Sequence, residues 1–153
     1  MLIKQLAYPS GGAQPYTNWE TIDFVFTNVQ GATITTGFAV CLTTTAASVD
    51  GISMVLPATR NITTFAGISL SDVPNNGVGL ARSWGLCNSV AIFVHGNSGS
   101  VAAGDVMGPS ATSAQGVHPA GISTVLGPVI NMVSFGATVN SPGGWTKGFV
   151  RAM

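Results

Sequence analysis

The sequence has almost no helical periodicity, and this feature limits the possible folds more than any other. Long charged helix formers are scarce, whereas the chain contains 20 Gly and 8 Pro together with many Thr and Ser residues. This composition is typical of short strands joined by turns. Turn signals recur at 49–51, 74–77, 96–99 and 141–144. The sequence therefore predicts an all-β fold, either a small β-barrel or a β-sandwich.

The segments between these turns are the candidate strands. They are 24–29, 33–42, 52–56, 63–70, 77–86, 90–94, 129–135 and 148–152. In 77–86, side chains alternate between large and small. Val78, Leu80, Arg82, Trp84 and Leu86 share one face, and Gly79, Ala81, Ser83 and Gly85 share the other. The nearly bare face predicts a tightly packed barrel interior, and the alternative is a surface that accepts a strand from another subunit.

The first 31 residues differ from the rest. Pro and Gly at 9, 11, 12 and 15 prevent a long regular element, yet the segment contains five of the twelve aromatic residues. They are Tyr8, Tyr16, Trp19, Phe24 and Phe26. We expect an extended N-terminal arm (1–31) before a β-rich domain (32–153). The arm either folds over its own core or lies across a neighbouring molecule, and we favour the second arrangement because aromatic anchors gain free energy when buried.

Charge is scarce in this chain. Charged residues make up 7% of it, against about 25% in ordinary soluble domains. Five basic and five acidic residues cancel, and the basic residues are scattered, which argues against nucleic-acid binding. No apolar run approaches the roughly 18 residues of a membrane span, and no signal peptide is expected. Such a chain has either an uncharged polar surface or a surface covered by partners.

The run from Gly96 to Ser100 resembles a degraded form of the box around the nucleophile of chymotrypsin-like proteases. Ser98 is preceded by a single histidine, His95, which is too close in the chain to act as a base from a separate strand. The other histidine, His118, follows the serine. Gly, Asn and Ser are also what a hairpin turn requires. We therefore predict a turn here and a protein that is not an enzyme.

No metal or cofactor site is expected. Cys41 and Cys87 match no zinc pattern and are interpreted as small buried apolar residues, although one bridge between them is possible. The aspartates lie mostly at turns, where their carboxylates bond backbone N–H groups. Glu20 is the only glutamate, so nothing indicates a carboxylate pair of the glycosidase type.

Three segments of the sequence carry a resemblance to a known family. They are TFAGISLSDVPNNGVGLARSWGLCNSVAIFV, VAAGDVMGPSA and the closing GFVRAM. Together they resemble the small capsid cement, or head decoration, proteins of tailed bacteriophages. The resemblance covers roughly residues 60–111 and the last six, and it rests on patterns of small residues.

The resemblance implies a non-enzymatic structural protein of the virion. It would bind the outer capsid surface, bridge neighbouring major capsid proteins and form a homotrimer. We expect interface residues among the five aromatics of the arm, with Arg82 and Trp84 as additional candidates. The alternatives are another virion component, such as a tail, fibre or minor capsid protein, and a small carbohydrate-binding β-sandwich with exposed aromatics on a rigid face.

Truncation of residues 1–20 is expected to weaken capsid binding more than folding, because the arm contributes burial against a neighbour. Capsid cosedimentation and thermal unfolding measure the two effects. An equal loss of both would contradict the intermolecular role of the arm.

Overall fold

The computed structural model describes residues 2–6, 20–45, 50–58, 61–94, 100–110, 117–119, 132–134, 139–140 and 143–152. These residues form strands, turns and one short 3-10 helix, η2 (Ile62–Thr64). The strands are β1 (Leu2–Leu6), β2 (Glu20–Asn28), β3 (Ala39–Leu42), β4 (Ser53–Val55), β5 (Phe65–Ser69), β6 (Val78–Phe93), β7 (Ser100–Val101), β8 (Val106–Pro109), β9 (Val117–Pro119), β10 (Met132–Ser134), β11 (Val139–Asn140) and β12 (Gly143–Arg151). Among the described residues, no helix is long and apolar enough to cross a membrane.

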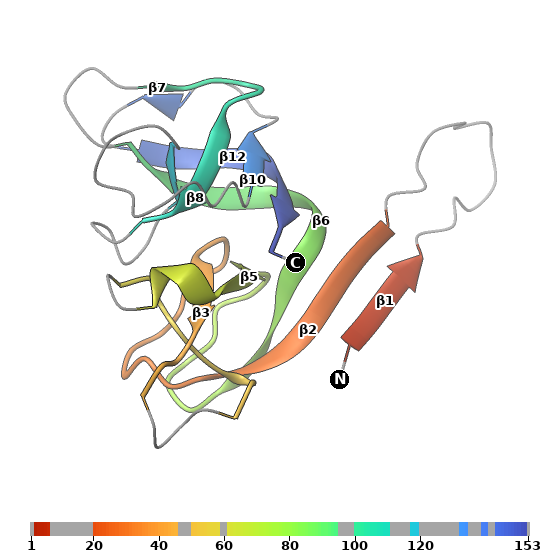
Figure 1. The fold of residues 1–153 in the computed structure, drawn as a ribbon, viewed down its shortest axis with the longest axis vertical. Coiled ribbons are helices and arrows are strands. Elements are labelled where there is room, and N and C mark those ends of the chain that lie inside the picture. Colours follow the sequence, from red (N-terminus) through yellow and green to blue (C-terminus); the bar gives the residue numbers. More distant parts are fainter. Residues whose placement is uncertain are drawn as a thin grey trace.

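A closed five-stranded mixed barrel confirms the predicted all-β fold. Its strands follow one another in the order β2, β4, β3, β5 and β6, and β6 pairs with β2 to close the ring. Only the contact between β2 and β4 is parallel. Figure 1 shows this barrel below the second group of strands.

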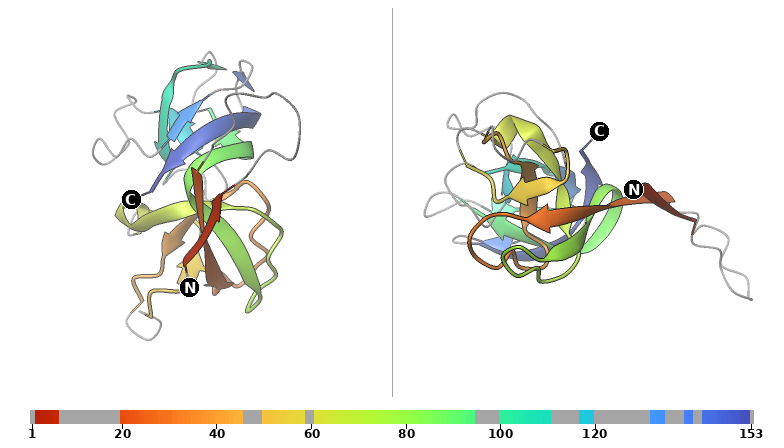
Figure 2. Two further views of the ribbon diagram at one scale, coloured as in Figure 1. Left: turned by 90° about the vertical axis from the view of Figure 1, so that its right-hand side faces the viewer. Right: turned by 90° about the horizontal axis from the view of Figure 1, so that it is seen from below.

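The second group of strands is built on the other half of β6. From β6 the pairing continues to β12, β10, β8 and β9. β9 returns to β6 through a parallel contact between Val117 and Ile92, so these pairings also form a ring. A separate pair, β7 with β11, lies outside this ring. The long strand β6 thus belongs to both halves of the molecule (Figures 1 and 2).

One face of β6 lines the interior of both halves. Ala81 belongs to the core of the barrel, whereas Cys87, Val90 and Ile92 belong to the second core. Gly85 lies between them with φ of +114°, a backbone conformation that glycine adopts without strain. The strand therefore changes direction at Gly85 and carries the same face from one core to the other.

Two hydrophobic cores meet at β3. Ala39 and Cys41 point into the second core, and Val40 and Leu42 contact the barrel core, as the alternation of a strand requires. β3 is therefore covered on both faces, which explains why its central residues are all apolar. The barrel core also contains Phe26, Ile34, Met54, Leu56 and Val73.

The small residues of segment 77–86 face inward, as predicted for a packed barrel interior. Ala81 is fully buried, and a Cβ at Gly79 would lie 2.2 Å from a methyl group of Val73. The large residues of the same strand face outward. Val78 is 68% exposed and Leu80 is 38% exposed. A narrow barrel has room for backbone and methyl groups opposite Phe26, so the larger side chains lie on the outside.

Several predicted boundaries need correction. Segments 77–86 and 90–94 are one continuous strand, because a bulge rather than a turn occupies Asn88 and Ser89. Segment 33–42 shortens to Ala39–Leu42, since Gly37 has φ of +79° and forms a turn. Segment 129–135 is described only at Met132–Ser134, and 148–152 begins earlier, at Gly143.

The expected domain boundary at residue 31 is also corrected. Residues 20–28 form β2, which pairs with β6 inside the barrel wall and places Phe26 in the core. Leu2–Leu6 forms β1, which pairs antiparallel with Glu20–Phe24 at the end of β2 that extends beyond β4 (Figures 1 and 2). The part of the predicted arm between these strands, 7–19, lies outside the described residues.

Gly67→Ala tests the close packing of β5 against β6. A Cβ at this position would lie 2.3 Å from the carbonyl oxygen of Arg82, so the backbone of one strand must move. We expect a loss of about 1–3 kcal/mol in the free energy of unfolding, measured with urea. Val78→Ala, at an exposed position of β6, is the control and should cost less than about 1 kcal/mol. If Gly67→Ala leaves the midpoint of urea denaturation unchanged, the two strands β5 and β6 are not packed as closely as described.

Candidate interaction surface

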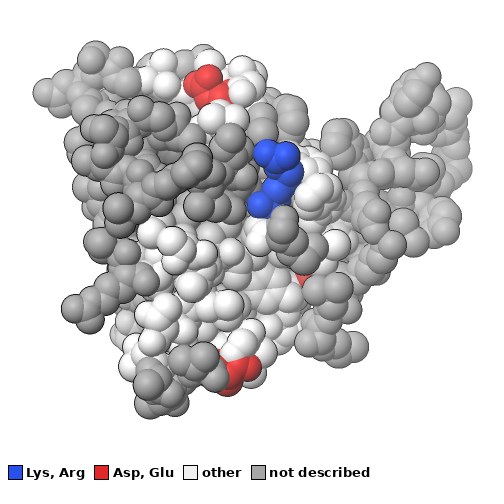
Figure 3. All heavy atoms as spheres, viewed as in Figure 1, with Lys and Arg blue, Asp and Glu red and all other residues white. Residues whose placement is uncertain are grey.

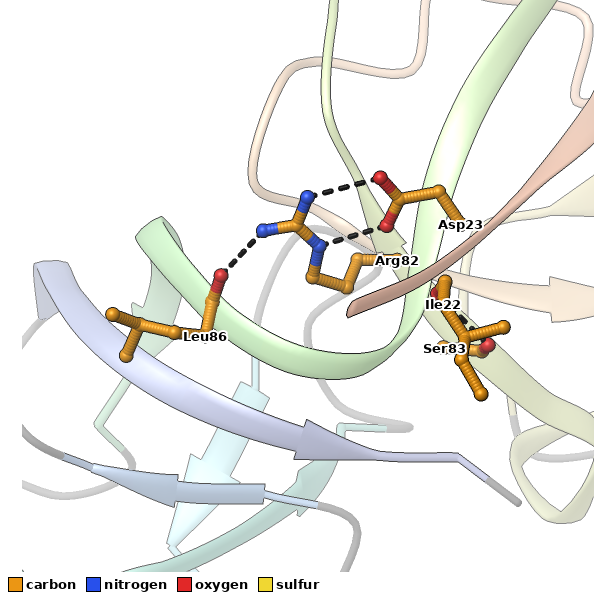
Figure 4. Close-up of polar contacts among 5 residues, drawn as sticks. All are labelled: Ile22, Asp23, Arg82, Ser83 and Leu86. Atoms are coloured by element: carbon orange, nitrogen blue, oxygen red, sulfur yellow. Dashed lines mark hydrogen bonds and ion pairs between the residues drawn. The ribbon is translucent and has the colours of Figure 1, made fainter. Parts of the chain in front are cut away.

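The bend of β6 is held by Arg82. Its Nε and Nη2 atoms donate to the two carboxylate oxygens of Asp23 on β2, at 2.7 and 2.9 Å (Figure 4). Its Nη1 atom donates to the carbonyl oxygen of Leu86, on the other side of Gly85. One guanidinium therefore ties the barrel wall to the part of β6 that enters the second half of the molecule.

This ion pair is largely shielded from water. The side chain of Arg82 is 17% exposed and that of Asp23 is 8% exposed. The hydrogen bonds to Asp23 raise the pKa of Arg82 above its usual value, against the opposite effect of burial. A bidentate guanidinium–carboxylate pair fixes both distance and orientation. The guanidinium thus has partners within the molecule, and a contact of Arg82 with another protein stays a prediction.

Three other aspartates organise loops, as the sequence predicted. Asp50 accepts hydrogen bonds from the backbone N–H groups of Ile52 and Ser53, and Asp105 accepts one from Ala102. Asp72 accepts bonds from the backbone and hydroxyl of Thr36, a partner far away in the sequence. The hydrogen bonds to their carboxylates lower the pKa of Asp50 and of Asp72. The carboxylates of Asp50 and Asp72 thus have structural partners that stabilise the charged form.

Both cysteines are free and buried, which confirms their interpretation as core residues. Cys41 and Cys87 belong to the same hydrophobic core. Burial raises the pKa of each thiol to about 12. Since the thiolate is the reactive form, neither side chain is set up for nucleophilic chemistry. Among the described residues, no three His, Cys, Asp or Glu side chains gather closely enough to hold a metal ion.

An aliphatic patch covers the outer surface of the barrel. We define it by Val25, Ile52, Val78 and Leu80. Val25 pairs with Leu80 across β2 and β6, and the adjacent pair is Thr27 with Val78. Ile52 joins from the other side of β2, because its carbonyl accepts the N–H of Thr27. Ile52 is 49% exposed and lines the same groove as Val25, so exposed apolar residues lie on both sides of one short part of β2.

An apolar groove of about 460 Å³ adjoins this patch. It opens where β2 and β4 diverge after only two paired residues. Its walls include Phe24 and Val25 from β2, Phe65 from β5, and Ile52 beside β4. The patch and the groove therefore share Val25 and Ile52, and they form one continuous apolar surface.

A second exposed apolar feature lies on β12. Trp145 is 53% exposed, and its indole stacks on Phe38 with ring centroids 6.2 Å apart and an interplanar angle of 16°. Further along β12, Phe149 meets Trp84 of β6 edge to face, with centroids 5.3 Å apart. Trp145 is thus an exposed aromatic side chain on a paired strand.

Figure 3 shows how little charge the described surface presents on one side of the molecule. A single basic area and small acidic areas stand among uncharged atoms. The aliphatic patch itself contains no ionisable side chain. A partner of this patch would gain free energy by burying apolar area rather than by neutralising charge.

The residues expected at an interface have different locations. Phe26 is fully buried in the barrel core, which corrects its assignment to an interface. Phe24 is partly buried and lines the groove, and Trp84 is partly buried against Phe149. Tyr8, Tyr16 and Trp19 lie outside the described residues, as does the segment 95–99 with His95 and Ser98. The protease-like box therefore stays a prediction of a turn.

Sequence reasoning missed Ile52 and Trp145. Ile52 was assigned to a strand, and only its contact with Thr27 places it beside Val25. Trp145 follows two glycines near the C-terminus, where no strand was expected. The alternation of 77–86 placed Val78 and Leu80 on the face opposite the predicted interior, but it did not show that these two side chains stay exposed.

No protein-family model matches the chain, and no curated protein matches it.

Replacement of Arg82 by Met tests the bend of β6. The change leaves the carboxylate of Asp23 buried without its partner, and we expect a loss of about 3–5 kcal/mol in unfolding free energy. The double variant Asp23→Leu/Arg82→Met should recover much of the lost unfolding free energy, because it removes the unpaired carboxylate as well. Arg151→Met removes an exposed cation and should change stability by less than about 0.5 kcal/mol. If urea denaturation shows the same change in unfolding free energy for Arg82→Met and Arg151→Met, then Arg82 does not stabilise the bend of β6.

Proposed function

We propose that this protein is a structural component of a virion that decorates the outer surface of the capsid. In this role it cements neighbouring major capsid proteins and stabilises the shell, and it acts as a homotrimer. It needs no cofactor and catalyses no reaction. The proposal starts from the resemblance to capsid cement proteins and gains support from the surface of the barrel.

The observation that carries the proposal is the continuous apolar surface formed by the aliphatic patch and the groove. Val78, Leu80 and Ile52 are held on paired strands or next to them, so their exposure does not depend on a loose loop. Soluble monomers seldom present contiguous apolar side chains without a use for them. A rigid sheet face of this kind fits the surface of a folded protein partner.

The scarcity of charge agrees with a protein that is covered in its working state. Charged residues are 7% of the chain and cancel to zero net charge. Free soluble proteins usually carry a net charge that keeps them dispersed. On a capsid, many weakly bound copies would reinforce one another through multivalency. The same composition argues against nucleic acid as the partner.

The aromatic residues Tyr8, Tyr16 and Trp19 remain proposed contacts with a neighbouring subunit or with the capsid. Since truncation of residues 1–20 would also remove β1, replacement of the three side chains by Ser is the cleaner form of that test. A tail, fibre or minor capsid protein remains the alternative. The place of attachment on the particle would distinguish these roles.

The double variant Val78→Ser/Leu80→Asp tests the capsid-binding role of the aliphatic patch. Both residues face outward, so the fold should tolerate the change, whereas a docked protein would have to bury a carboxylate. We expect at least about a tenfold loss of affinity, or roughly 1.4 kcal/mol, in cosedimentation with undecorated capsids. The melting temperature should fall only modestly, because Leu80 is 38% exposed, and the mass in solution should stay as in the wild type.

Thr63→Ala, at an exposed position of η2, serves as the matched surface control and should bind normally. If the double variant pellets with shells as well as the wild type does, the patch is not the docking surface. If the wild type itself does not pellet, the proposed function is wrong.

A further inference from the structure

We propose that Trp145 and its neighbours form a binding site for a sugar ring of a glycan, separate from the apolar surface of the barrel. The site consists of Trp145 stacked on Phe38, together with Asn88, Ser89 and Lys147. It would give the protein a second activity, independent of docking through the aliphatic patch.

The indole of Trp145 is fixed in position. Phe38 covers one of its faces at a 6.2 Å centroid distance and a 16° interplanar angle. Gly37 leaves room for the ring, because a Cβ there would lie 2.5 Å from Cζ3 of Trp145. The backbone of Gly37 is itself held, since its N–H donates to Ser69 and its carbonyl accepts from Ala91.

Beside its contacts with Phe38 and Gly37, the indole keeps a large exposed surface. Trp145 is 53% exposed, although burial of such a ring would be favourable. A flat, rigid aromatic face matches the C–H face of a pyranose, whose hydroxyl groups project around its edge. Because the indole is already ordered, a sugar can stack on it at little conformational cost to the protein.

Exposed polar residues occupy strand positions close to Trp145. On β12, Lys147 lies two residues beyond Trp145, and both side chains are exposed while Thr146 between them is buried. On β6, a bulge places Asn88 and Ser89 opposite Lys147. Two consecutive residues of a strand are therefore exposed, which a regular strand would not allow.

These three side chains supply an amide, a hydroxyl and an ammonium group. Together they can donate and accept hydrogen bonds around the edge of a ring that rests on the indole. The carbonyl of Ser89 also lies close to the ring, because the same Cβ position at Gly37 is 2.9 Å from that oxygen.

The surroundings favour a sugar over a protein partner. A tryptophan that anchors a protein interface usually lies at the centre of a larger apolar area from which water is excluded. Around Trp145, the neighbouring exposed side chains on β6 and β12 are Asn88, Ser89 and Lys147, which are all polar. The aliphatic patch shows the other pattern, with apolar neighbours on β2 and β6.

The test uses the full-length protein and two defined probes. Isothermal titration calorimetry is performed with a hexamer of N-acetylglucosamine and with a hexamer of galacturonic acid, and a glycan array extends the search. We expect saturable binding of at least one probe or arrayed glycan. Trp145→Ala should weaken that binding about tenfold or more, whereas Trp145→Phe should retain part of it.

Ile52→Ser is the matched control, because it removes an exposed apolar side chain of similar exposure from the aliphatic patch. It should leave glycan binding unchanged. The proposal is overturned if the wild type binds neither hexamer nor any arrayed glycan, or if Trp145→Ala binds as tightly as the wild type.

Capsid cosedimentation separates this site from the proposed docking surface. Trp145→Ala should still pellet with shells, and Val78→Ser/Leu80→Asp should still bind the glycan. If Trp145→Ala loses capsid binding and the wild type binds no glycan, then Trp145 is a contact with protein.

Discussion

The guanidinium of Arg82 is the contact on which the arrangement of both halves depends. It binds the carboxylate of Asp23 in the barrel wall and the carbonyl of Leu86 beyond the bend at Gly85. Strand β6 pairs with β2 and β5 before the bend and with β12 after it. The direction of this one strand therefore sets the angle between the barrel and the second ring of strands. A planar cation with several donors can fix such an angle, and a flexible ammonium could not do so as well.

The outer face of β6, the strand that both halves share, carries exposed apolar side chains. Where it lines the narrow barrel, the inner face of β6 carries the small residues Gly79, Ala81 and Ser83. The outer face carries the large residues, and nothing within the described chain covers Val78. The apolar surface that we propose for docking is thus a direct result of how the barrel is filled. Trp145 is exposed for another reason, since Phe38 and Gly37 fix it beside a bulge with polar neighbours.

Much of the fold was predictable because strand formation is a local property. Segments 63–70 and 77–86 were predicted as strands from their composition and the turn signals between them, and the structure has strands at Phe65–Ser69 and from Val78 onward. Cys41 and Cys87 were correctly placed in the core. The bulge at Asn88 and Ser89 was taken for a break between strands, since polar residues at consecutive positions also mark a turn. The role of Asp23 was missed, because its partner Arg82 is far away in the sequence and the two meet only when β2 pairs with β6.

The sequence by itself determined that the chain forms strands rather than helices, that it carries almost no charge, and that one face of segment 77–86 is bare. These properties follow from residue types and from short spacings. Only the tertiary structure decided between a packed interior and a subunit surface for the bare face, and showed that Phe26 is core rather than anchor and that Ile52 lies beside Val25. The physical reason is that alternation fixes which side chains share a face, whereas the pairing of strands distant in the chain fixes which face is buried.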